Sequence, residues 1–174
     1  CLVARSGQGI IFLDADDHET DRRFTLAHEI AHFILDHLLP RLRALKVFGE
    51  RILPVLDGKR APSQEEILSA VLERVQLGVQ VHLMNRGPKG AICTWDVEQS
   101  EQRADRLALE LLAPGLATVA ELRQVLGDAD SLGGHVSRAV DYVAERFGLP
   151  NDVAASYVQL LLGQRRKRLS LTEE

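Results

Sequence analysis

Apolar and polar positions recur with the period of an α-helix over most of this chain, but the first residues show a different pattern. There, the apolar runs 1–4 and 10–13 flank Ser6-Gly7-Gln8-Gly9, and two such runs around a glycine-rich turn predict a β-hairpin. Helical spacing then predicts helices over about 20–39, 42–48, 63–84, 100–114, 116–126, 136–147 and 151–163. The pattern therefore predicts an α+β fold that is mostly helical, with a small β-sheet.

The expected ends of these helices depend on local signals. Pro40 is expected to end the first helix, because a proline inside a helix removes a hydrogen bond and clashes with the preceding turn. Ser63 and Glu66 form a capping-box pattern at the start of a later helix, which we expect to run towards Met84. Residues 91–95 are expected to form a short strand.

Composition narrows the class of protein. The chain has 174 residues, of which 45% are hydrophobic, enough to bury a core. Its net charge of −4 argues against direct binding to nucleic acid. No apolar run is long enough to span a bilayer and no signal peptide is visible, and Cys1 and Cys93 do not form a disulfide framework. We therefore expect a cytoplasmic protein without a membrane anchor.

The candidate chemistry begins with the H-E-x-x-H pattern of zinc hydrolases, which His28, Glu29 and His32 form in the first predicted helix. Helical residues four apart share a face and lie about 6 Å apart, so both imidazoles can bind one ion at about 2.0–2.1 Å. With one more protein ligand, a fourth position stays open for water. The ion lowers the pKa of that water to about 7, and Glu29 can accept its proton.

An ordinary buried helix with hydrogen-bonded core histidines is the alternative interpretation. The surrounding residues Ile30, Ala31, Ile34 and Leu35 make this helix apolar almost all round, which is typical of a buried helix. Burying two imidazoles and a carboxylate is costly unless they are paired or bind a metal, which favours the metal site. Asp36 shares the face of His32 but lies about 12 Å along the axis from His28, so it is at most an outer partner of a ligand.

A second helix offers the missing ligand. Glu101 and Asp105 are four apart and share a face, with Ala104 and Ala108 beside them to let another helix approach closely. Glu101 is a natural third metal ligand, and Asp105 could accept the other ring N–H of a ligand histidine. Alternatively, both acids are solvated, as acids near a helix start often are.

The C-terminal region has the pattern helix, glycine-containing turn, helix, with the turn near Gly148-Leu149-Pro150. Its second helix is mostly apolar and lacks the side chains that read base edges, so we interpret it as a packing element. The basic run 165–168 is interpreted as a solvated end.

Two motifs in this order resemble the ImmA/IrrE family of metallopeptidase-like proteins. The first is the Phe24-Thr25-Leu26 lead-in to His28-Glu29-x-x-His32. The second is the segment Glu101–Pro114, which follows the family's form E-x-x-A-[ND]-x-[FL]-A-x-x-L-L-x-P. The segment 145–153 also looks like the helix-turn-helix-like segment that often follows in this family. The resemblance covers about 40 residues closely.

The resemblance implies a zincin-like metallopeptidase domain over 1–114, with a helical insertion at about 40–90, and a helix-turn-helix-like segment over 115–174. It implies that His28, His32 and Glu101 bind Zn²⁺, with Mn²⁺ as the alternative, and that Glu29 is the catalytic base. An oxyanion would need a further donor, for which Tyr142 and His135 are candidates, with plain packing or surface roles as the alternative for each. The expected substrate is a helix-turn-helix transcriptional repressor, as for an anti-repressor or stress-response regulator.

The sequence departs from the family pattern in two places, and two other functions are alternatives. The interval 33–100 looks longer than usual and holds an extra helix, and Leu107 stands where phenylalanine is common. The chain could instead be a non-catalytic module that sequesters a repressor or toxin, although an intact Glu29 argues against that. Direct DNA binding by the C-terminal helices is the third alternative, which the acidic net charge disfavours.

Overall fold

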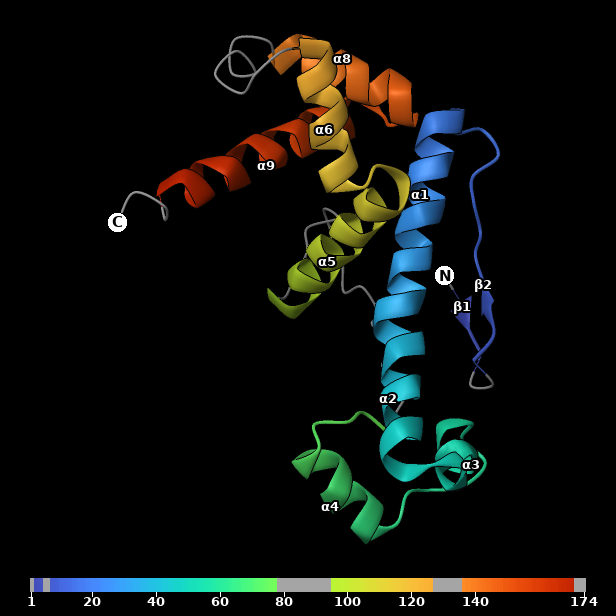
Figure 1. Ribbon diagram of the computed structural model, residues 1–174. Helices are drawn as coiled ribbons and strands as arrows, with labels where there is room; N and C mark the ends of the chain where they lie inside the picture. Colours follow the sequence, from blue (N-terminus) through green and yellow to red (C-terminus); the bar gives the residue numbers. More distant parts are fainter. Residues whose placement is uncertain (1, 5–6, 78–94, 127–135, 171–174) are drawn as a thin grey trace. The chain divides into compact units, whose positions relative to one another are not determined.

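The structure, a computed structural model, describes residues 2–4, 7–77, 95–126 and 136–170 (Figure 1). The chain divides into two compact units. Unit 1 comprises residues Cys1–Phe12 and His28–Asp105, and unit 2 comprises Leu13–Ala27 and Arg106–Glu174. The described residues are mostly helical with one two-stranded sheet, which confirms the coarse fold class. In this described part, no helix has the length and apolarity needed to cross a membrane.

The predicted hairpin at the start of unit 1 is confirmed. Strands β1 (Leu2–Val3) and β2 (Gly9–Ile10) pair antiparallel, with Leu2 opposite Ile10 and Val3 opposite Gly9. Gly7 adopts a φ of 86°, and its N–H donates to the carbonyl of Ala4 at 2.9 Å. Such a positive φ is strained for other residues, so the glycine allows the tight turn.

The prediction that the first helix ends at Pro40 is wrong. Helix α1 (Glu19–His32) continues through a π-helical segment, η1 (Phe33–Leu38), into α2 (Leu39–Phe48). At the junction, the Leu39 N–H donates to the carbonyl of Ile34, five residues earlier. In an α-helix, the Pro40 ring would clash with the carbonyl of Asp36. The wider turn shifts the hydrogen-bond register there, so the chain stays helical.

A small core holds the next part of unit 1 together. After α2 come the 3₁₀ turn η2 (Glu50–Ile52), α3 (Leu53–Leu56) and α4 (Gln64–Leu72). The buried residues of this core are Ala44, Phe48, Ile52, Val55 and Ala70. An ion pair between Arg41 Nη2 and Asp57 Oδ1, 2.6 Å long, links α2 to the residue after α3.

Helix α4 begins as predicted but ends earlier. The capping box is confirmed, because Ser63 Oγ accepts from the Glu66 N–H and the Glu66 carboxylate accepts from the Ser63 N–H. The expected continuation towards Met84 is wrong, since α4 ends at Leu72. Arg74 adopts a φ of 52°, and the Val75 N–H donates to the carbonyl of Ala70 at 2.8 Å. A residue with a positive φ at this position ends the helix. Glycine is the usual residue there, but in this chain the residue is Arg74.

The described residues of unit 2 include the helices α6 (Gly115–Leu126), α8 (Val136–Phe147) and α9 (Asn151–Ser170). The predicted ranges of the first two are confirmed closely. Between α8 and α9, Gly148 adopts a φ of 61°, which lets the chain turn within three residues. The contiguous core consists of Leu109, Ala113, Leu122, Ala139, Val143, Ala144, Phe147, Leu149, Ala154, Tyr157 and Val158.

Candidate metal centre

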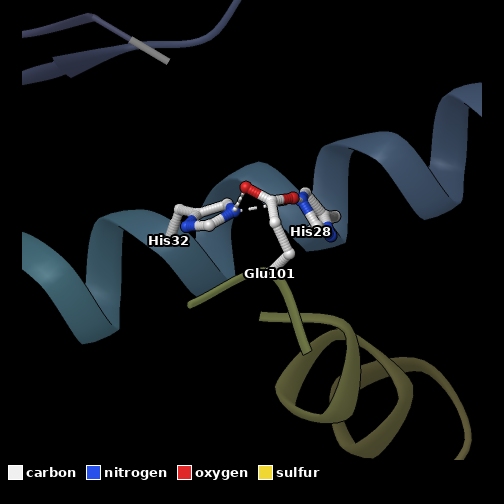
Figure 2. A group of neighbouring side chains, drawn as sticks. All are labelled: His28, His32 and Glu101. Carbon is white, nitrogen blue, oxygen red and sulfur yellow. Dashed lines mark hydrogen bonds and ion pairs between the residues drawn. The ribbon is translucent and has the colours of Figure 1, made fainter. Parts of the chain in front are cut away.

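The histidines of the H-E-x-x-H pattern and Glu101 lie together within unit 1. His28 and His32 project from α1 and Glu101 from α5 (Trp95–Leu112), as Figure 2 shows. One ligand atom of each residue lies within 4.8 Å of the others. The two Nε2 atoms are 3.1 Å apart. The Glu101 carboxylate reaches both, with Oε2 at 3.3 Å from His28 Nε2 and Oε1 at 3.4 Å from His32 Nε2.

Helical spacing and small residues explain this arrangement. Residues four apart share a face of α1, which aligns the two imidazoles. Ala31 on α1 and Ala104 on α5 are both fully buried, and the absence of long side chains there leaves room for close approach. The expectation that α1 is buried nearly all round is too strong, because Leu26 and Ile30 are 37% and 36% exposed. Only the alanine side of the helix is well covered.

Each histidine has a carboxylate on its other ring nitrogen. His28 Nδ1 lies 2.8 Å from Asp105 Oδ1, the contact that the sequence suggested for Asp105. His32 Nδ1 lies 2.9 Å from Asp36 Oδ2. The hydroxyl of Ser100 also donates to Asp36 Oδ2, at 3.3 Å. Both Nδ1 atoms are therefore engaged, and both Nε2 atoms lie towards Glu101.

The carboxylates give the site a negative electrostatic environment. The hydrogen bond with Asp36 is the main influence that raises the pKa of His32 above its usual value. Burial opposes this shift, while the charges of Glu101, Asp36 and Glu29 add to it. A cation placed between the Nε2 atoms would offset this concentration of negative charge.

The donor set fits a divalent metal ion. Two imidazole nitrogens and one carboxylate form a ligand set of the kind found in catalytic zinc sites, which keep a further position for water. The same set suits several other divalent ions. A histidine whose Nδ1–H donates to a carboxylate has its Nε2 lone pair available for a metal. His28, His32 and Glu101 are thus the residues that would hold the ion.

The other candidate residues lie elsewhere or outside the described residues. The Tyr142 hydroxyl, in unit 2, donates to Glu121 Oε2 at 3.0 Å. His135 and residues 91–94 of the expected strand 91–95 lie outside the described residues, and the placement of Trp95 in that strand is wrong because Trp95 begins α5. Asp36, which the sequence allowed at most as an outer partner of a ligand, lies against His32 Nδ1. Its spacing of four from His32 was the usable signal for this contact.

An H-E-x-x-H pattern together with a glutamate from a second helix is typical of a metallopeptidase-like site. Residues 2–53 match the family model described as the IrrE N-terminal-like domain, Peptidase_M78. This confirms the resemblance to the ImmA/IrrE family over that segment. No curated protein matches the chain. No solved structure matches it either.

The family match covers one side of the candidate metal centre. It includes His28, Glu29 and His32, as well as Asp36. Glu101 and Asp105 lie beyond the matched residues, so their inclusion in the site depends on the distances given above.

Proposed function

We propose that this chain is a zinc-dependent, site-specific peptidase that cleaves a helix-turn-helix transcriptional repressor. The observation that carries the proposal is the meeting of His28 Nε2, His32 Nε2 and the Glu101 carboxylate within 4.8 Å. The match of residues 2–53 to a peptidase family supports a metallopeptidase-like activity. The repressor as substrate follows from the ImmA/IrrE resemblance, and Mn²⁺ is the alternative metal.

In the proposed hydrolysis, different residues of the chain have different roles. His28, His32 and Glu101 would hold the ion, which would acidify a coordinated water and polarise the peptide carbonyl. Glu29 accepts a proton from the attacking water and delivers it to the leaving amine. Asp105 holds the His28 ring through Nδ1, where the two atoms are 2.8 Å apart. Of these residues, Glu29 alone moves a proton, so its loss should slow cleavage strongly while leaving the metal ligands in place.

The test measures metal content and cleavage together. The purified chain is stripped with a chelator, reloaded with Zn²⁺ or Mn²⁺, and mixed with the helix-turn-helix regulator encoded beside it. We expect metal-dependent cleavage at one bond. In Glu29→Gln, the metal content should be unchanged and the cleavage rate should fall by about 10²–10⁴-fold. Glu65→Gln, which alters an exposed acid on α4, is the matched control and should cleave normally.

The same experiment separates cleavage from sequestration. Tight binding of the regulator by metal-loaded protein, without any cleaved product, would reject the peptidase proposal and favour the binding module. Equal cleavage by wild type and Glu29→Gln would reject the role of Glu29. Binding to DNA that weakens as salt rises would instead favour direct nucleic-acid contact.

A further inference from the structure

Asp36, in the π-helical segment η1 that continues α1, is hydrogen-bonded to α5. A single oxygen, Oδ2, lies 2.9 Å from His32 Nδ1 and 3.3 Å from Ser100 Oγ. We propose that Asp36 and Ser100 form a latch that positions the metal ligands on both helices. The proposal concerns the metal site itself and rests on the proposed function only in requiring that the site bind a metal.

The His32 side of the latch selects the form of the imidazole that can bind metal. A neutral imidazole has one N–H donor and one acceptor nitrogen. A carboxylate accepts but does not donate, so Asp36 favours the proton on Nδ1 and leaves the lone pair on Nε2. That nitrogen is the one that lies 3.4 Å from Glu101 Oε1. Asp36 therefore orients His32 towards the third ligand.

The Ser100 side of the latch acts on the second helix. Ser100 directly precedes Glu101 in α5, and its hydroxyl donates to the same Asp36 oxygen. This bond joins residues 64 positions apart in the sequence. It restrains α5 next to the residue that supplies the carboxylate ligand. Loss of the hydroxyl should therefore displace Glu101 relative to His32, although Ser100 is not one of the three candidate ligand residues.

The two histidine–carboxylate pairs are unequally shielded from water. The Asp36 side chain is 13% exposed, whereas that of Asp105 is 49% exposed. Water competes for the hydrogen bond of an exposed carboxylate and screens its charge, so a buried partner holds an imidazole more firmly. We therefore expect Asp36 to matter more for metal binding than Asp105.

The experiment measures metal affinity by competition with a chromogenic chelator, using the full chain and Zn²⁺, and records the visible spectrum of the Co²⁺-loaded protein. Asp36→Ala should weaken Zn²⁺ binding by about 10–100-fold. Asp105→Ala should weaken it less. Ser100→Ala should lose about threefold to tenfold, the value of one hydrogen bond, and Ser100→Thr should restore the affinity because it keeps the hydroxyl. Gln99→Ala, an exposed neighbour on α5, is the control.

The Co²⁺ spectrum distinguishes positioning from general stability, because it reports the ligand geometry and not the amount of folded protein. A shifted spectrum in Asp36→Ala and Ser100→Ala, but not in Gln99→Ala, is the expected result. Folded Asp36→Ala with wild-type affinity and spectrum would overturn the proposal. If Asp36→Ala does not fold, equal affinities for Ser100→Ala and Ser100→Thr would overturn it instead.

Failure of this inference is distinct from failure of the proposed function. Wild type that binds Zn²⁺ but cleaves nothing would reject the peptidase while leaving the latch measurable by affinity and spectrum. Wild type that binds neither Zn²⁺ nor Co²⁺ would reject the metal site and the latch together.

Discussion

Each of the two units is stabilised internally by a different kind of interaction. Unit 2 has a contiguous apolar core that includes the fully buried Val143 and Val158 and the mostly buried Phe147. The described part of unit 1 has a smaller core around Phe48 and Ile52, and a separate polar cluster at the candidate metal centre. The comparison teaches that apolar burial stabilises unit 2, whereas unit 1 also relies on charged groups that a metal ion would join.

The largest expected effect comes from removing a core phenylalanine. Phe147→Ala should destabilise the protein by about 3–5 kcal/mol, because it leaves a cavity in the core of unit 2. Native-state hydrogen exchange should show faster exchange in α8 and α9, with less change in 28–48. Phe48→Ala, the matched variant in unit 1, should show the reverse. If each variant opens both units equally, the contrast between the units is wrong.

Metal binding should give the next largest effect, and it should be confined to unit 1. At a free Zn²⁺ concentration of about 100 Kd, linkage predicts a stabilisation of about 2.7 kcal/mol. Hydrogen exchange should slow around 28–36 and 97–105, and α8 and α9 should be unaffected. His32→Ala removes a ligand and should abolish the stabilisation. If Zn²⁺ slowed exchange in α8 and α9 as much as around 28–36 and 97–105, the contrast between the two units would be wrong.

A smaller effect is expected at the start of α4. Ser63→Ala removes the side chain that accepts from the Glu66 N–H, and loss of such a cap costs about 1 kcal/mol. Ser63→Asp should retain most of the stability, because aspartate also caps helices well. Urea unfolding of the three proteins measures the difference. Identical midpoints for Ser63→Ala and wild type would show that the capping box contributes nothing.

The smallest effect is a dependence on pH in the same capping box. Hydrogen bonds from Arg60, and then from the Ser63 backbone, lower the pKa of Glu66 from 4.5 to about 2. A carboxyl with a lowered folded-state pKa stabilises the fold above pH 4.5, and this contribution is lost as the pH falls towards 2. The difference in unfolding midpoint between wild type and Glu66→Gln should therefore shrink over that range. A constant difference would contradict the pKa shift.

Local patterns predicted much of this architecture. The spacing of His28 and His32 places both imidazoles on one face, and the pair Ser63 and Glu66 fixes the start of α4, because each depends on residues within one helical turn. The bounds of α6 and α8 followed from apolar periodicity. The placement of Glu101 beside the histidines depends on tertiary structure, and from the sequence it was a hypothesis only.

The wrong predictions share a physical cause. Pro40 should break an α-helix, but the π-helical turn before it changes the hydrogen-bond register, which no single-residue preference reveals. Helix α4 ends at Leu72 and is followed by Arg74 with a positive φ, a position where a glycine would have signalled the end. The contact between Asp36 and Ser100 joins two helices, so it required the fold. Local rules fail where the surrounding structure overrides the preference of one residue.

The candidate centre also has a consequence for the order of folding. His32 and Glu101 are separated by about 70 positions, so bringing them together closes a long loop, whereas α8 and α9 are joined by a short turn. Contacts between distant positions form slowly compared with local ones. We therefore expect the centre to be completed late in folding. A nascent chain carrying only the first helix holds two histidines without their glutamate, and the three ligand residues would come together only after α5 has packed against that helix.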